Sequence, residues 1–145
     1  MTMPAGKYWV GDLCYVMHGE WDEACGLFFK DRTDHGCNEG EFQLKDGRRF
    51  VSINTRWGDG GYYDQFGNEY GVDAGLIGCI LLQDIDLTYN GNSLLGGHVV
   101  EFATPFEVTG GRREGSEWNG IIGIGHICIE TDPVYEDQED YECEE

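Results

Sequence analysis

Two carboxylates near the middle of the chain have a spacing that could support chemistry. Asp84 and Asp86 would share one face at the end of a long apolar strand, about 7 Å apart. At that separation they could be the acid and base of a glycoside hydrolase. They could also bind Ca²⁺ together with Asn90 and Asn92 of the next turn. The simpler interpretation is a solvated strand end, so a calcium site at Asp84, Asp86 and Asn90 is an open alternative.

Cysteine and histidine form two further combinations. His126 and Cys128 would share one face of a strand as a base and a nucleophile, but the isoleucines around them are typical of an inert, packed thiol. Cys25, His35 and Cys37 could hold a soft metal such as zinc. The six cysteines contain no Cys-x-x-Cys pair, the spacing typical of structural zinc sites. We expect no catalytic residues, and a cofactor only if one of these metal sites forms.

Two arginine pairs and a glycine-rich run raise the question of anion binding. Arg48-Arg49 and Arg112-Arg113 would form a clamp if folding brought them together, although compensation of nearby acids is the commoner role. The run at 58–61, Gly-Asp-Gly-Gly, lacks the lysine and the following helix of a phosphate-binding loop. We interpret this run as a turn.

The overall charge is the strongest indication about partners. The 145 residues hold 28 acids and nine bases, so the formal net charge is −19. Residues 133–145 contain seven of the acids and no base, and the rest of the chain still carries −12. Such a surface repels nucleic acids and anionic lipids, because binding them requires Lys and Arg. It attracts cationic partners such as metal ions and basic protein surfaces.

Neither membrane insertion nor secretion is expected. No stretch reaches the roughly 18–20 apolar residues of a membrane helix, and the first residues lack the apolar core of a signal peptide. The six cysteines are therefore expected to be mostly reduced thiols. The expected location is cytoplasmic.

The elements that position these residues are mostly short strands. One helix is expected at about 19–30, with an apolar stripe at Trp21, Ala24, Cys25 and Phe28. Strands are expected at 7–10, at 13–17, in a hairpin at 41–45 and 48–55, at 62–64, at 69–74, at 76–87, at 98–108 with a break near Pro105, and at 121–131.

The 23 glycines, with turn signals at intervals of about 8–12 residues, favour a sandwich over a helical bundle. We predict one α+β, β-rich domain over residues 1–132, a mostly antiparallel sandwich or bent sheet with one helix in the N-terminal half. Residues 133–145 are predicted to form an acidic C-terminal tail.

Side chains suited to a protein partner occur in the turns and in the tail. Exposed Trp and Tyr are enriched at protein interfaces, and carboxylates would pair with a basic partner. The residues predicted to bind the partner are Trp57, Tyr62, Tyr63, Glu136, Asp137, Glu139, Asp140 and Glu142.

Several segments together resemble a known group of proteins. They are 8–16 (YWVGDLCYV), 58–62 (GDGGY), 70–78 (YGVDAGLIG) and 125–132 (GHICIETD). In this pattern the chain resembles small, acidic proteins of phages and other large DNA viruses, a group without an assigned activity. The resemblance implies a viral accessory protein, and therefore a cytoplasmic location in the host cell.

Charge and resemblance together suggest a non-enzymatic binding protein. We expect it to dock on a basic host protein surface, as a nucleic-acid mimic or an inhibitor of host defence, with no direct contact to nucleic acid or membrane. The alternative is a domain that binds a small ligand or a metal ion, Ca²⁺ or Zn²⁺. A hydrolase is a third hypothesis, which needs two titratable groups within hydrogen-bond reach in a cleft.

Overall fold

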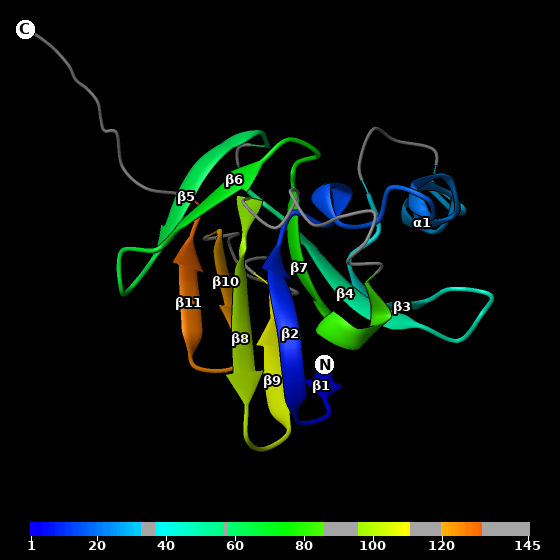
Figure 1. Cartoon of the computed structure of the whole chain (residues 1–145). Helices are drawn as coiled ribbons and strands as arrows, with labels where there is room; N and C mark the ends of the chain where they lie inside the picture. Colours follow the sequence, from blue (N-terminus) through cyan, green and yellow to red (C-terminus); the bar gives the residue numbers. More distant parts are fainter. Residues whose placement is uncertain (33–36, 57, 86–95, 111–119, 132–145) are drawn as a thin grey trace, which may run out of the picture.

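Two antiparallel sheets pack against each other as a sandwich in the computed structural model of the chain (Figure 1). The structure describes residues 1–32, 37–56, 58–85, 96–110 and 120–131. The described residues include the α-helix α1 (Trp21–Phe28) and the 3-10 turns η1 (Leu13–Tyr15) and η2 (Leu82–Asp84). The predicted β-rich class with a helix near the N-terminus is confirmed. The acidic tail lies outside the described residues.

The five-stranded sheet has the strand order β3-β4-β7-β2-β8. In chain order its strands are β2 (Gly6–Gly11), β3 (Gly40–Gln43), β4 (Arg49–Asn54), β7 (Leu76–Leu81) and β8 (His98–Phe102). The central strand β7 is buried on both faces, because Ile77 and Cys79 belong to the core between the sheets and Leu76 and Ile80 to the core around α1. Burial on both faces explains its continuous apolar sequence.

The six-stranded sheet has the strand order β1-β9-β10-β11-β5-β6. In chain order its strands are β1 (Thr2–Met3), β5 (Gly60–Asp64), β6 (Glu69–Val72), β9 (Phe106–Thr109), β10 (Ile121–Ile124) and β11 (Ile127–Glu130). Buried and more exposed residues alternate along β9, β10 and β11. One face of this sheet therefore packs on the core, and the other faces solvent.

Two hydrophobic clusters stabilise this arrangement. The cluster between the sheets includes Tyr8, Val10, Val51, Ile53, Tyr62, Tyr70, Ile77, Val108, Ile122, Ile124, Ile127 and Ile129. The second cluster lies between the five-stranded sheet and α1 and includes Trp9, Leu13, Met17, Ala24, Phe28, Phe50, Leu76 and Ile80. Alternate residues of β2, Tyr8 and Trp9, belong to different clusters, so this strand joins the two cores.

The helix has the predicted apolar stripe but is shorter than predicted. Ala24 and Phe28 are buried, and Trp21 packs edge-to-face on Phe28 with ring centroids 5.7 Å apart. The helix spans Trp21–Phe28, with Glu20 and Phe29 as its capping residues, instead of the predicted range of about 19–30. None of the described helices is long and apolar enough to cross a membrane.

Two predicted strands are partly 3-10 turns. The segment expected as a strand at 13–17 contains no strand and begins with η1, because the Asp12 side chain accepts a hydrogen bond from the Cys14 N–H and caps a turn. The strand expected at 76–87 ends at Leu81 and is followed by η2. The apolar sequence continues there because Leu82 and Ile85 pack into the cluster under α1.

Two other expected strands are each divided. The strand at 98–108 is interrupted near Pro105 as predicted, but its halves belong to different sheets, β8 and β9. The segment at 121–131 is a hairpin and not one central strand, because Gly125 has a positive φ of 60° and starts a turn. The three-residue step from Ile124 to Ile127 keeps both of these side chains in the core across the turn.

The predicted hairpin at 41–55 is confirmed. β3 pairs with β4 in the register Phe42↔Phe50, and Gly47 in the turn has φ 100°.

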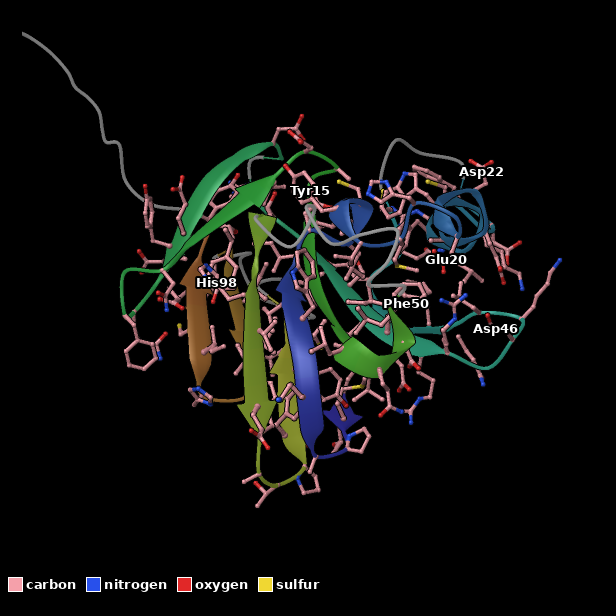
Figure 2. All side chains as sticks on the ribbon, in the orientation of Figure 1. Tyr15, Glu20, Asp22, Asp46, Phe50 and His98 are labelled. Atoms are coloured by element: carbon pink, nitrogen blue, oxygen red, sulfur yellow. The ribbon has the colours of Figure 1, made fainter. Side chains whose placement is uncertain are left out.

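At the other end of the same sheet, the edge strand β8 meets β6 through His98, whose Nε2 lies 2.7 Å from the Glu69 carbonyl oxygen (Figure 2). The His98 ring also packs edge-to-face on Tyr70 at 4.8 Å. This contact fixes the β5–β6 hairpin against the five-stranded sheet.

Candidate functional site

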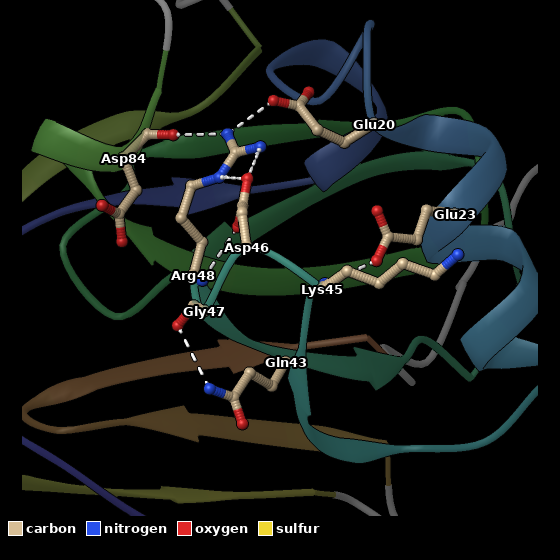
Figure 3. A network of polar contacts seen from close by, with 8 residues as sticks. All are labelled: Glu20, Glu23, Gln43, Lys45, Asp46, Gly47, Arg48 and Asp84. Atoms are coloured by element: carbon tan, nitrogen blue, oxygen red, sulfur yellow. Dashed lines mark hydrogen bonds and ion pairs between the residues drawn. The ribbon is translucent and has the colours of Figure 1, made fainter.

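Arg48, from the first of the two arginine pairs, is part of a structural network of polar contacts (Figure 3). Arg48 Nη1 donates to the Glu20 carboxylate at 2.5 Å and to the Asp84 carbonyl oxygen at 3.0 Å, and its Nε donates to Asp46 Oδ2 at 2.9 Å. Arg49 forms an ion pair with Glu41 across β3 and β4. Both arginines therefore compensate nearby acids, while Arg112 and Arg113 lie outside the described residues.

One of the two carboxylates proposed for hydrolysis or calcium, Asp84, does not lie on a strand. Asp84 is the last residue of η2, so the period-two spacing with Asp86 does not apply. Burial raises the pKa of the Asp84 carboxyl. Asp86, Asn90 and Asn92 lie outside the described residues, within which no group of three metal-ligating side chains occurs. The calcium site stays a prediction.

The pair of His126 and Cys128 has a different geometry from the one expected. His126 lies in the exposed turn between β10 and β11, and Cys128 is exposed on β11, so the thiol is not packed among isoleucines. Burial raises the thiol pKa of Cys25 and of Cys37, which favours the protonated form. His35, the third residue of the proposed zinc site, lies outside the described part of the chain.

The aromatic residues predicted to bind a partner differ in exposure. Tyr62 is only 3% exposed, and its hydroxyl donates to the Gly58 carbonyl oxygen at 2.9 Å. Its ring belongs to the core between the sheets, and its predicted role in partner binding stays a prediction. Tyr63 is 54% exposed and is available to a partner. Trp57 and the acidic residues Glu136, Asp137, Glu139, Asp140 and Glu142 lie outside the described residues.

Strand pairing places Tyr63 between two carboxylates on the outer face of the six-stranded sheet. Glu130 of β11 is its cross-strand partner on one side, and Glu69 of β6 is its partner on the other. Ile121 of β10 follows Glu130 in the same row. Neighbouring strands lie about 4.8 Å apart, so the Cα atoms of the two glutamates are about 10 Å apart. We call Glu130, Tyr63 and Glu69 the acidic–aromatic row.

A pocket of about 400 Å³ lies beside this row, lined by Gly61, Tyr62, Tyr63, Asp64, Gln65, Cys128 and Glu130. Its volume is in the range of small-ligand sites, about 300–1,000 Å³. The Glu69 carboxylate lies over Gly61, because a Cβ atom built on that glycine would be 2.6 Å from Glu69 Oε2. Because Gly61 has no side chain, the Glu69 carboxylate can lie against the sheet surface at this position.

Gln65 fixes the position of one end of this pocket. Its amide nitrogen donates to the His126 carbonyl oxygen at 2.6 Å, and its amide oxygen accepts from the Cys128 N–H at 2.8 Å. These two bonds tie the β5–β6 turn to the β10–β11 turn. Phe66 in the same turn is 66% exposed and lies 6.4 Å from the His126 ring. Tyr63 and Phe66 are therefore both exposed, and the Gln65 hydrogen bonds hold the backbone of the turn that carries Phe66.

Charge is distributed unequally between the two sheets. Every ionisable acid or base on the described strands of the six-stranded sheet is acidic: Asp64, Glu69, Glu107 and Glu130. The bases on described strands, Lys7 and Arg49, belong to the five-stranded sheet. Arg56 is joined to the residue that follows β11, because its backbone N–H donates to Thr131 Oγ1, and Arg56 is partly buried. Asp64 faces the core, whereas Glu69, Glu107 and Glu130 are exposed, so the described strands give the outer face of the six-stranded sheet a negative charge.

Asp64 supports the pocket from the core side. Its carboxylate accepts hydrogen bonds from the Phe66 and Asn68 N–H groups, from the Asn68 amide and from the Tyr70 hydroxyl, at 2.8–3.2 Å. Burial by itself raises the pKa of the carboxyl, but these hydrogen bonds outweigh burial and lower the pKa. The charged form of Asp64 therefore stabilises the β5–β6 turn.

This lowered pKa predicts a pH dependence of stability. The folded state favours the charged carboxylate, so its contribution is present above the unfolded pKa of about 4 and is lost as the pH falls through the folded pKa. Asp64→Asn is expected to cost about 1–2 kcal/mol at pH 7, and the difference from the wild type should shrink towards pH 3. Urea unfolding at pH 7, 5 and 3 measures this. A difference that stays constant would contradict the assignment.

Comparisons of the chain with protein-family models, with curated proteins and with solved structures find no match. The interpretation of this face therefore depends on its own residues. Sequence reasoning identified Tyr63 but missed Glu69, Gln65 and Glu130. Period-two alternation in 60–64 and 127–130 marks Tyr63 and Glu130 as exposed, but no sequence signal indicates that they are neighbours.

Proposed function

We propose that this chain is a non-enzymatic binding protein that docks on a basic protein surface through the outer face of its six-stranded sheet. The acidic–aromatic row supports this proposal most strongly, because an exposed tyrosine between two carboxylates is suited to Lys and Arg side chains. Following the resemblance to viral proteins, we propose a host protein as the partner, with mimicry of nucleic acid as one form of this binding.

The residues that follow β11 in the sequence carry further negative charge. Glu130 is the last residue of that strand, and residues 132–145 contain eight acids and no base. Charge of one sign raises the encounter rate with a cationic partner and repels anionic ones. The charge of the sheet face and that of the following segment would act on the same partner.

A synthetic peptide of alternating Arg, Lys, Gly and Ser residues provides a defined probe of this binding. Glu69→Gln combined with Glu130→Gln is expected to weaken binding about tenfold, because each lost ion pair is worth about 0.7 kcal/mol. Raising the salt concentration from 0.05 to about 0.5 M should weaken binding further, since screening lengths then shrink well below 10 Å. Isothermal titration or fluorescence anisotropy measures both effects.

The matched control is Glu101→Gln, which removes one exposed carboxylate from β8 in the other sheet. This variant should change the affinity less than twofold. Binding that ignores salt, or that responds equally to Glu101 and to the acidic–aromatic row, would contradict the proposed face.

The pocket supports a second candidate function, binding of a small ligand. Its volume of about 400 Å³ and its mixture of Tyr63, Gln65, Cys128 and Glu130 fit a small polar molecule with an apolar part. Soaking or thermal-shift screening with uncharged compounds tests this alternative. A neutral compound that binds in the pocket while basic peptides do not would favour it.

A further inference from the structure

We propose that the pocket beside Tyr63 receives an arginine side chain of the partner, in preference to lysine. This inference rests on the proposed function and identifies the chemical group that the face recognises. The exposed Tyr63 ring provides a surface on which a planar guanidinium can stack, and the carboxylates of Glu69 and Glu130 flank it. A guanidinium has five donors in one plane, whereas an ammonium is a compact, strongly hydrated charge.

The pocket has room for such a group next to the ring. Gly61 shares the outer face with Tyr63, two residues away on β5, and has no side chain. Both polar atoms of the Gln65 amide already bond to the backbone of the β10–β11 hairpin, so they hold the turn in place. Glu130 and the Tyr63 ring line the pocket and can contact a ligand, and the Glu69 carboxylate lies beside it, over Gly61. The volume of about 400 Å³ exceeds that of one arginine side chain, so flanking backbone would also fit.

The partner's cation is favoured because the strands of this sheet supply no Lys or Arg of their own. Among described residues, Arg48 and Arg49 are paired with acids around the β3–β4 hairpin, and the N-terminal amine lies 3.6 Å from Glu107 on β9. Glu69 and Glu130 are both exposed. Charge complementarity therefore selects a basic segment over a neutral or acidic one.

Two peptides of equal length and charge test the preference, one carrying only arginine and the other only lysine as its bases. The wild type is expected to bind the arginine peptide about fivefold more tightly at 0.15 M salt. Tyr63→Ala should abolish this preference, whereas Tyr63→Phe should keep it because the ring is retained. Phe29→Ala is the matched control, since Phe29 is also about half exposed, at 52%, but follows α1.

Cys128 offers an independent way to block the pocket, because its exposed thiol is among the lining groups. In a Cys143→Ser background, reaction of the native protein with N-ethylmaleimide should modify Cys128 and reduce binding of the arginine peptide at least fivefold. Peptide mass spectrometry identifies the modified residue. Unchanged binding by protein modified at Cys128 would overturn the proposal.

The outcomes separate this inference from the proposed function. Equal binding of both peptides, weakened alike by Glu69→Gln and Glu130→Gln, would overturn the arginine pocket and leave the basic-partner function intact. Failure of both peptides to bind would overturn both. Sedimentation of the free protein is measured in parallel, because a dimer that Tyr63→Ala dissociates would show that a second copy covers the face and would overturn the arginine assignment.

Discussion

Gly78→Ala is expected to prevent stable folding. Gly78 lies in β7, where it pairs with Ser52 of β4 on one side and with Gly11 of β2 on the other. A Cβ atom at this position would be 1.8 Å from the Val51 carbonyl oxygen and 2.8 Å from its carbonyl carbon. These are backbone atoms inside a ladder, so they cannot move without breaking the pairing of β4 with β7.

The expected cost of Gly78→Ala exceeds about 3 kcal/mol, the upper part of the range for overpacked cores. A domain of this size is typically stable by about 5–15 kcal/mol, so the variant should lose most of its margin. Circular dichroism and urea unfolding measure the effect. A midpoint close to that of the wild type would contradict the described packing of β7 on β4.

Gly26→Ala is the matched control for this substitution. Gly26 lies in α1, and a Cβ atom there would meet no atom within 4 Å. Alanine in a helix is favoured over glycine by about 0.5–1 kcal/mol. The same chemical change is therefore expected to stabilise the protein at one position and to unfold it at the other.

Asp12→Ala is expected to have the second largest effect on stability. The carboxylate of Asp12 is fully buried and accepts hydrogen bonds from three backbone N–H groups. They belong to Cys14 at 3.0 Å, Asp73 at 2.8 Å and Ala74 at 2.6 Å. These bonds join the end of β2 to the β6–β7 turn, and the Tyr15 hydroxyl adds a bond to the Asp73 carboxylate in the same place. Alanine would leave three donors without their acceptor.

The expected cost of Asp12→Ala is about 3 kcal/mol, roughly 1 kcal/mol for each N–H that loses its partner. Asp59→Ala is the control, because it removes the same charge from an exposed position and should change stability by less than about 0.5 kcal/mol. Thermal and urea unfolding of both variants measure the difference. Equal stability of the two variants would show that the three hydrogen bonds contribute little.

The same turns that stabilise the fold also hold the proposed binding face. Asp64 fixes the β5–β6 turn from the core side, and Gln65 fixes it to the β10–β11 turn. The backbone that carries the acidic–aromatic row is therefore already ordered before a partner binds, which reduces the entropic cost of association. An exposed tyrosine on a fixed strand also loses little conformational entropy on binding, because only two side-chain torsions must be restrained.

Local patterns in the sequence determined the fold class, the helix and the clearest hairpin. The apolar spacing of Trp21, Ala24 and Phe28 predicts a helical face, and the alternation around Asp46-Gly47 predicts β3 and β4. Both signals arise between residues close in the chain. The same reasoning failed for 76–87 and 121–131, because apolar runs look alike whether they form a strand, a 3-10 turn or a hairpin.

Only the tertiary structure decided which side chains of the candidate site are neighbours. Glu130 lies beside Tyr63 because β11 pairs with β5, although 66 residues separate these two in the chain. The exposure of Cys128 and the burial of Tyr62 likewise depend on where each strand is placed in the sheet. Strand order depends on long-range packing of both sheet faces, and a period-two pattern carries no information about which strand pairs with which. The sequence thus specified the charge and type of the residues, and the fold specified their arrangement.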